Sequence, residues 1–292
     1  MGRVIACANQ KGGVGKTTTV VNLATYLALS GAHVLVVDLD PQGNATSGFG
    51  IDRTALDRSV YDAIVDDSSL AALITRTAVP RVDIVPAAMS LAGAEVELAT
   101  MDQRERRLQR LLATVRGDYD YVLIDSAPSL GLLTVNALTA ADGVLIPIQC
   151  EYYALEGLGQ LISTIHLVRD HLNPDLAIDG AVLTMADPRT NLSNEVAAEV
   201  RRHLGGAVFE SVVPRSVRLS EAPSYGRPVA LYRPESKGAQ AYQSVATELR
   251  GRIEGRSGDP ARPTRGRSDV STNVSTSPTA GPLQHAVAGV DR

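Results

Sequence analysis

The sequence predicts an α/β fold: a doubly wound, mostly parallel sheet of about seven or eight strands flanked by helices. Short apolar runs alternate with helical patterns along most of the chain, as they do when helices connect parallel strands. Runs such as Val34–Val37 are apolar on both faces, which is typical of central parallel strands. Hydrophobic residues make up 44% of the 292 residues, so the chain has enough apolar surface for a large core.

The expected strands are short apolar runs, several of them rich in β-branched residues. In chain order they are Val4–Ala8, Val34–Val37, Val82–Val85, Tyr121–Ile124, Val144–Ile148, Ile178–Thr184 and Val208–Val213. Helices are expected where apolar residues recur three or four positions apart, beginning with Val20, Leu23, Ala24 and Leu27. The later helical patterns are Leu91–Val115, Leu155–Leu172, Asn194–Leu204 and Gly238–Ile253.

The alternation of strands and helices stops near residue 254, so we expect one domain over residues 1–254. Residues 255–292 are rich in Ser, Thr, Pro, Gly and Arg and contain few large apolar residues. Such a segment buries too little apolar surface to offset the entropy lost on ordering it. We therefore expect residues 255–292 to form a disordered tail.

Charge, cysteine content and hydropathy limit where the protein can be located and which kinds of partner it can bind. The formal net charge is −4, so any binding of nucleic acid must come from a local basic patch. Cys7 and Cys150 show no metal-ligand spacing and favour a reducing cytosol. The most apolar stretch, Leu130–Ile148, is interrupted by Asn136 and Asp142, so we expect no membrane span. These observations predict a cytoplasmic protein.

The first expected strand is followed by a glycine-rich loop that opens the first expected helix. Its sequence is Lys11-Gly12-Gly13-Val14-Gly15-Lys16-Thr17-Thr18. Glycines allow the backbone to turn its N–H groups toward phosphate oxygens, and the start of a helix adds a favourable dipole. Lys16 would contact the β- and γ-phosphates, and the Thr17 hydroxyl would ligate Mg²⁺. The whole loop, through Thr18, is therefore predicted to bind a nucleoside triphosphate.

This loop differs from the common phosphate-binding motif G-x-x-x-x-G-K-[ST], which would have glycine where this chain has Gln10. It carries a second lysine, Lys11, at its start. The pattern K-G-G-x-G-K-T-T resembles the deviant Walker A motif of the ParA/MinD family of ATPases. In that family the extra lysine reaches the phosphates of the other subunit in a nucleotide-sandwich dimer. The resemblance implies that Lys11 couples ATP binding to formation of a homodimer.

Aspartates end two more of the expected strands, at the edge where α/β sheets bind ligands. Asp38 and Asp40 lie in the string D-L-D-P-Q-G-N-A-T, and Asp125 closes the fourth strand. A single carboxylate at the end of an apolar strand suits Mg²⁺ binding, so Asp125 is predicted as a metal ligand beside Thr17. By resemblance to the family's switch I, Asp40 activates the attacking water and Asp38 supports the loop or the Mg²⁺ shell. Residues 125–131 resemble switch II.

Two later segments resemble regions that surround the nucleotide in the same family. Residues 147–157 resemble a stretch at the dimer face. Residues 213–223 resemble the loop near the adenine, where the position of Pro214 packs on the base. Ser216 is the other nucleotide-binding position that this resemblance implies, although relatives often carry asparagine there.

Two arginines suggest what the ATPase binds. Arg189, in D-P-R-T-N, and Arg218, in V-R-L-S, match positions that chromosomal, Soj-type ParA proteins use to bind double-stranded DNA without sequence preference. Guanidinium groups suit phosphate oxygens. The resemblance covers roughly residues 3–250 and implies a nucleoid-associated partitioning ATPase. Its ATP-bound homodimer would bind DNA and release it after a ParB-like partner stimulates hydrolysis.

Other functions on similar scaffolds need other residues. A MinD-like, membrane-associated positioning ATPase is the main alternative, and it needs a basic amphipathic helix near the C-terminus. The last expected helix instead carries apolar residues at the spacing of a core-packing face, after which the chain is polar. Nitrogenase iron-protein relatives need cluster-binding cysteines that this chain lacks. Amidoligase-like synthetases need an additional substrate pocket that no motif here indicates.

Overall fold

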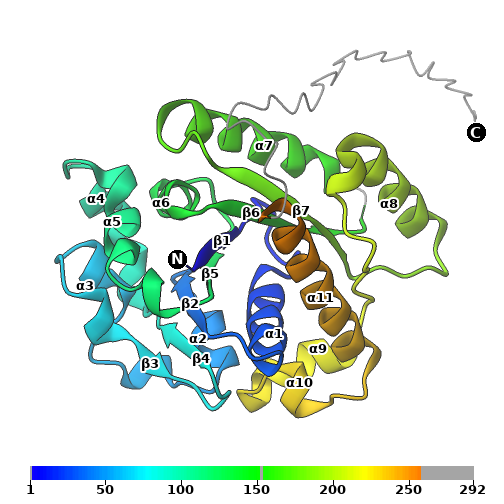
Figure 1. Ribbon diagram of the computed structural model, residues 1–292, viewed down its shortest axis with the longest axis horizontal. Helices are drawn as coiled ribbons and strands as arrows, with labels where there is room; N and C mark the ends of the chain where they lie inside the picture. The colour runs from blue at the N-terminus through cyan, green and yellow to red at the C-terminus, as the bar shows by residue number, and fades with distance from the viewer. Residues whose placement is uncertain (1, 152–153, 258–292) are drawn as a thin grey trace, which may run out of the picture.

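The computed structural model describes residues 2–151 and 154–257 (Figure 1). The last helix in this part, α11 (Lys237–Ser257), continues three residues beyond the domain boundary expected at 254. Residues 258–292, which make up nearly all of the expected tail, lie outside the described residues. The division into one domain and a disordered tail therefore stays a prediction.

Within the described residues the sheet has seven strands, in the order β3-β4-β2-β5-β1-β6-β7. They are β1 (Arg3–Cys7), β2 (Val34–Leu39), β3 (Thr75–Arg76), β4 (Val82–Val85), β5 (Tyr121–Ser126), β6 (Gly143–Gln149) and β7 (Ala177–Thr184). All neighbouring pairs are parallel except β3 and β4, which are antiparallel. The expected fold class is confirmed, and the two-residue edge strand β3 is an addition that no apolar run indicated.

The expected strand Val208–Val213 is wrong. This segment runs along β7 and forms a parallel bridge between Ala181 and Val208, but no strand. Its ladder is interrupted because the backbone N–H groups of residues 210 and 211 both donate to the carboxylate of Glu248 on α11, at 3.0 Å each. A side chain from a neighbouring helix thus takes the hydrogen bonds that a strand would need.

Helices cover both faces of the sheet (Figure 1). Alternate residues of each strand point to opposite faces, so Val4 and Ala6 pack in one core cluster and Ile5 and Cys7 in the other. One face carries α1 (Lys16–Leu29), α2 (Asn44–Gly48), α9 (Val217–Glu221), α10 (Val229–Tyr232) and α11. The other carries α3 (Val60–Ile64), α4 (Ala94–Leu98), α5 (Arg107–Ala113), α6 (Leu132–Ala140), α7 (Ala154–His171) and α8 (Asn191–Leu204).

The pattern Leu91–Val115 predicts one helix, and the structure breaks it into α4 and α5. Gln103, between them, has a left-handed backbone with φ 49°. The break is held by Asn136 of α6, which accepts from the N–H of Leu108 at 3.1 Å and donates to the carbonyl of Arg104 at 2.7 Å. The helix is therefore interrupted by a tertiary contact that periodicity does not reveal.

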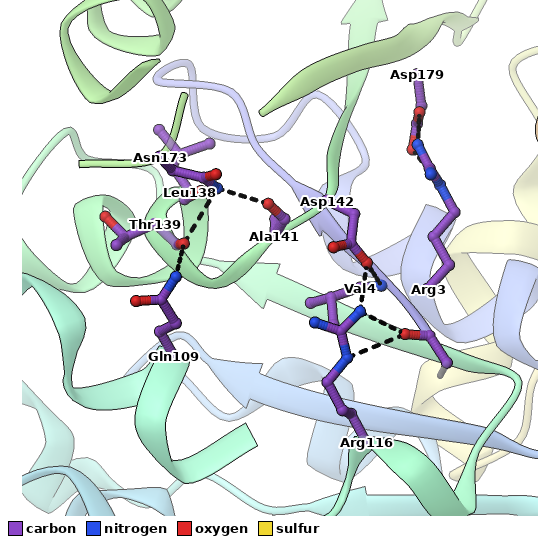
Figure 2. A network of polar contacts seen from close by, with 11 residues as sticks. Arg3, Val4, Gln109, Arg116, Leu138, Thr139, Ala141, Asp142, Asn173 and Asp179 are labelled. Atoms are coloured by element: carbon purple, nitrogen blue, oxygen red, sulfur yellow. Dashed lines mark hydrogen bonds and ion pairs between the residues drawn. The ribbon is translucent and has the colours of Figure 1, made fainter. Parts of the chain in front are cut away.

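A polar network ties together the amino ends of the strands (Figure 2). Asp142, just before β6, accepts from the backbone N–H of Val4 and from the guanidinium of Arg116, both at 2.8 Å. Arg3 of β1 forms an ion pair with Asp179 of β7. These contacts hold the amino ends of β1, β6 and β7 in place. The loops at the opposite, carboxyl edge carry the predicted functional residues.

Candidate nucleotide-binding site

The glycine-rich loop lies between the end of β1 at Cys7 and the start of α1 at Lys16. Gly13 and Gly15 have φ of 74° and 89°, in the left-handed region that favours glycine. A Cβ built on Gly13 would meet no atom of the described residues within 4 Å, so the face of the loop there is open. The first N–H groups of α1 have no partner within their own helix and are available to an anion.

Lys16 is held inside this loop. Its ammonium donates to the carbonyl of Lys11 at 3.4 Å, and the side chain is largely buried. Burial lowers the pKa of Lys16, and the nearby carboxyl groups of Asp125 and Asp40 act against that shift. The loop itself is fastened to β7 because the Thr184 hydroxyl donates to the carbonyl of Val14 at 2.8 Å. The ammonium group of Lys16 is thus held within the loop at the carboxyl edge of the sheet.

Asp125 of β5 lies opposite Asp38 of β2 in the strand register. Both carboxylate oxygens of Asp125 are buried without a hydrogen-bond partner among the described residues. The Thr17 hydroxyl is close enough to lower the pKa of Asp125, but it lies outside hydrogen-bond geometry. Burial, with the neighbouring Asp38, nevertheless raises that pKa well above its usual value. Orphaned carboxylate oxygens beside a hydroxyl fit a hard divalent cation such as Mg²⁺.

Asp38 and Asp40 differ in the number of hydrogen bonds that their carboxylates accept from the rest of the protein. Asp38 accepts from the N–H and the hydroxyl of Thr46, at 2.8 and 2.7 Å, and so anchors the first turn of α2. Burial raises the pKa of Asp38 to about 6, and the bonds from Thr46 oppose this shift. The carboxylate of Asp40 accepts one bond, from the N–H of Gln42 at 2.9 Å. Its other oxygen accepts none within the described residues, which suits a group that orients water.

A cavity of about 300 Å³ opens beside the loop. The structure brings Pro214 and Ser216, both predicted from the sequence, to its wall, together with Gly15 and Thr18 of the loop and Met185. This volume and lining suit a purine base next to the phosphate cradle. Sequence reasoning missed Met185 and the loop anchor on Thr184. Both stand at the carboxyl end of β7, and that position was the available signal.

Lys11 contacts an acid that was not predicted as a site residue. Its ammonium lies 3.9 Å from Glu151, whose carboxylate also pairs with Arg215 at 3.0 Å. Glu151 therefore links the glycine-rich loop with the loop that carries Pro214. The segment 147–157, expected at a dimer face, includes Tyr152 and Tyr153, which lie outside the described residues.

The two predicted DNA-binding arginines are exposed and paired with acids. Arg189 forms a two-pronged contact with Asp187, at 2.9 and 2.7 Å, and Arg218 pairs with Glu221 at 2.7 Å. Their segments are neighbours because the N–H of Arg215 donates to the carbonyl of residue 186 at 3.1 Å. Both arginines thus lie on adjoining segments beyond the nucleotide cavity.

Comparison with known proteins gives two kinds of match. The profile of a family described as an AAA domain matches residues 2–178. The chain is 56% identical to the sporulation initiation inhibitor protein Soj of Bacillus subtilis, over 85% of this chain and 98% of that protein. It is 52% identical to the chromosome partitioning protein ParA of Myxococcus xanthus, over 85% and 88%. The chain belongs to the Soj type of the ParA/MinD superfamily of ATPases.

Solved structures of other superfamily members support the same assignment. A Mycobacterium smegmatis structure, described as cobyrinic acid a,c-diamide synthase with bound ATP analog and magnesium, is 40% identical with a TM-score of 0.78. The matched region covers 88% of this chain and 97% of the M. smegmatis chain. The cell division ATPase MinD of Pyrococcus furiosus is 27% identical with a TM-score of 0.72, over 86% of this chain and 99% of its own.

The last described helix of this ParA/MinD-type ATPase packs in the core. Its apolar residues Tyr242, Val245 and Leu249 are buried, and the Tyr242 hydroxyl is 3.0 Å from the Thr19 hydroxyl of α1. The apolar face of α11 is therefore occupied by α1 and is not free to enter a bilayer. Within residues 2–151 and 154–257, no helix has the length and hydropathy of a membrane span.

Proposed function

We propose that this ATPase is an ATP-dependent DNA partitioning protein. The observation that carries its ATP-dependent part is that Asp125, whose carboxylate has no hydrogen-bond partner among the described residues, lies in register with Cys7, just before the open loop around Lys16. The M. xanthus protein reported above, which is 52% identical and is named a chromosome partitioning protein, indicates partitioning as the process that the ATPase drives.

ATP and Mg²⁺ are the ligands that the site fits. The loop N–H groups and Lys16 would bind the phosphates, while Thr17 and Asp125 would hold Mg²⁺. Held by Thr17 and Asp125, Mg²⁺ would supply positive charge to neutralise what develops on the phosphate oxygens. Pro214 and Ser216 would line the base pocket. Asp40, with one free carboxylate oxygen, would orient the attacking water.

The finer steps concern the assembly. Lys11 would leave Glu151 and reach the phosphates of a second copy, so that ATP binding closes a sandwich homodimer. The dimer would present Arg189 and Arg218 twice, which strengthens DNA binding without any new contact type. A ParB-like partner would then stimulate hydrolysis, and the separated monomers would leave the DNA. In the cell this cycle would make the protein nucleoid-associated.

The deciding experiment is binding to non-specific duplex DNA with ATP, with ADP and without nucleotide, across a salt series. We expect binding only with ATP, and a log–log salt slope of about −3 to −4 if the four arginines of a dimer each neutralise a phosphate. Lys16→Ala is the control, because it should lose nucleotide binding and with it the DNA response. DNA binding that is equal in all three nucleotide states would refute the proposed switch.

Two other outcomes would redirect the proposal. ATP-dependent binding to anionic liposomes without DNA binding would favour the MinD-like alternative.

An amide synthase is a second candidate, because the 40% identical M. smegmatis structure is described as one and a cavity of about 500 Å³, lined in part by Arg53 and Arg227, lies beside Thr17. ATP turnover that requires a carboxylic acid and a nitrogen donor would support it.

A further inference from the structure

Helix α6 begins directly after the switch II segment, which we define as residues 125–131. The residue at its N-cap position is Gly131, which has no side chain to accept a bond from the first turn, and that turn contains no acidic residue. The acceptor comes from another helix. The N–H of Leu133 donates to Oε1 of Glu95, on α4, at 3.4 Å. A carboxylate at this position also interacts favourably with the helix dipole.

Gly131 leaves the space that this carboxylate fills. A Cβ built on Gly131 would lie 2.0 Å from Oε1 and 2.8 Å from Oε2 of Glu95. The backbone of Gly131 has φ −77° and ψ −172°, which any residue adopts, so the backbone itself does not require glycine. The space is occupied by the carboxylate of Glu95, at the end of a flexible side chain, which packs against the Cα of Gly131.

The first turn of α6 is coupled to the rest of switch II. The Thr134 hydroxyl donates to the carbonyl of Ser129 at 2.7 Å, and the Ser126 hydroxyl donates to the carbonyl of Cys7 at 2.8 Å. One end of the segment is thus tied to β1 beside the glycine-rich loop. The other end is tied to the start of α6, which Glu95 caps.

We propose that Glu95 is a positioning residue for ATP hydrolysis, which acts by fixing the carboxyl end of switch II through α6. This inference rests on the proposed ATP hydrolysis at Asp125 and Asp40. Glu95 is not among the residues predicted to bind nucleotide or Mg²⁺, and its hydrogen bond goes to the N–H of Leu133. It holds the segment in one conformation, so that the catalytic groups keep their geometry during turnover.

The test uses substitutions on α4 in the full chain, with Mg²⁺ and ATP. Glu95→Ala should lower kcat by about three- to tenfold with KM for ATP unchanged, because the cap acts on the switch and not on the phosphate cradle. Glu95→Gln keeps the acceptor oxygen and should lose less. Glu97→Gln is the matched control, since Glu97 lies on the same helix and accepts from the Tyr61 hydroxyl at 2.8 Å, away from α6. It should behave as wild type.

Gly131→Ala provides a second route to the same defect. Its methyl group should displace the Glu95 carboxylate and lower kcat as much as Glu95→Ala does. In the double variant the methyl group meets no carboxylate, so the double variant should be no slower than Glu95→Ala alone. Losses that add, or Glu95→Ala with wild-type kcat, would overturn the proposal.

Hydrogen exchange separates this inference from the proposed function. The Leu133 amide should exchange faster in Glu95→Ala than in wild type, while amides of β1 and β5 keep their protection. Unchanged exchange at Leu133 would overturn the inference even if kcat fell. A wild-type chain without ATP turnover would refute the proposed function, and the exchange of Leu133 would still decide whether Glu95 caps α6.

Discussion

At the scale of single residues, Asp125 and Asp38 are both fully buried acids with opposite local roles. Asp38 is bonded by Thr46 and Asp40, so the fold itself uses its charge. Neither carboxylate oxygen of Asp125 has a hydrogen-bond partner in the part of the chain that the structure describes, and burial raises its pKa. A buried carboxylate without partners costs folding free energy, so Asp125 is a site where stability is given up for ligand binding.

Replacing Asp125 with asparagine tests whether this residue lowers the stability of the fold while it contributes to ligand binding. Without nucleotide, we expect Asp125→Asn to be as stable as wild type or more stable, by up to about 3 kcal/mol, because it removes an uncompensated buried acid. With Mg²⁺ and ATP, the rise in Tm seen for wild type should shrink, because a metal ligand is lost. Thermal melts with and without Mg²⁺ and ATP check both results. A less stable apo variant would mean that Asp125 has a structural partner.

For Asp40 we expect the opposite pattern: substitution should change the rate of ATP hydrolysis and not the affinity for ATP. Asp40→Ala should lower the rate of ATP hydrolysis by about 100-fold or more, since a water-orienting group typically contributes that much. ATP affinity should change little, because no phosphate-binding group is removed. Single-turnover hydrolysis and equilibrium ATP binding on the same preparation provide the measurement. Near wild-type turnover would reassign the role to another group.

At the scale of elements, the sequence predicted what local patterns encode. Six of the seven expected strands exist, since runs such as Val34–Val37 are apolar on both faces and lie in the sheet centre. Lys16 and Thr17 were predicted as site residues because strand, loop and helix follow one another in the chain, and Asp125 was predicted because it ends an apolar strand. Asp125 and Thr17 then meet because parallel strands end at one edge.

The elements that were missed depend on contacts between distant residues. The segment Val208–Val213 has a strand-like composition, but Glu248 takes two of its backbone donors. The helix pattern Leu91–Val115 is broken by Asn136. The cap on α6 comes from Glu95, on another helix. A side chain that replaces a backbone partner from far along the chain leaves no periodic signal, so sequence reasoning has no access to it.

Asn173 is another side chain that bonds to the backbone of residues far along the chain, and its contacts allow a prediction about stability. Its amide donates to the carbonyls of Leu138, Thr139 and Ala141, at 3.1, 3.1 and 2.7 Å, and so closes the carboxyl end of α6 (Figure 2). Asn173→Ala leaves these acceptors without that donor, so we expect a loss of about 1 to 3 kcal/mol in the free energy of unfolding. Urea denaturation measures it. Asn194→Ala, which removes an exposed bond to Pro188, is the control with little effect.

At the scale of the whole molecule, charge pairing bears on the proposed DNA binding. The net charge of −4 opposes approach to a polyanion, so binding must depend on a local patch. Both predicted DNA-binding arginines are paired with acids in the single chain. The hydrogen bonds from Arg189 lower the pKa of Asp187 to about 2, so this acid is ionised at neutral pH. DNA phosphates must therefore compete with Asp187 for Arg189.

Removing that competitor should strengthen DNA binding. Asp187→Asn frees Arg189 and removes one negative charge, so we expect the ATP-bound protein to bind duplex DNA about two- to fivefold more tightly at 0.1 M salt. Glu254→Gln removes the same charge from an exposed pair with Arg250 on α11 and serves as the control for net charge. Fluorescence anisotropy of a labelled duplex, across a salt series, compares the two variants with Arg189→Ala, which should bind more weakly. Equal gains from Asp187→Asn and Glu254→Gln would show that net charge alone is responsible, and Arg189 would then lose its assignment to the DNA surface.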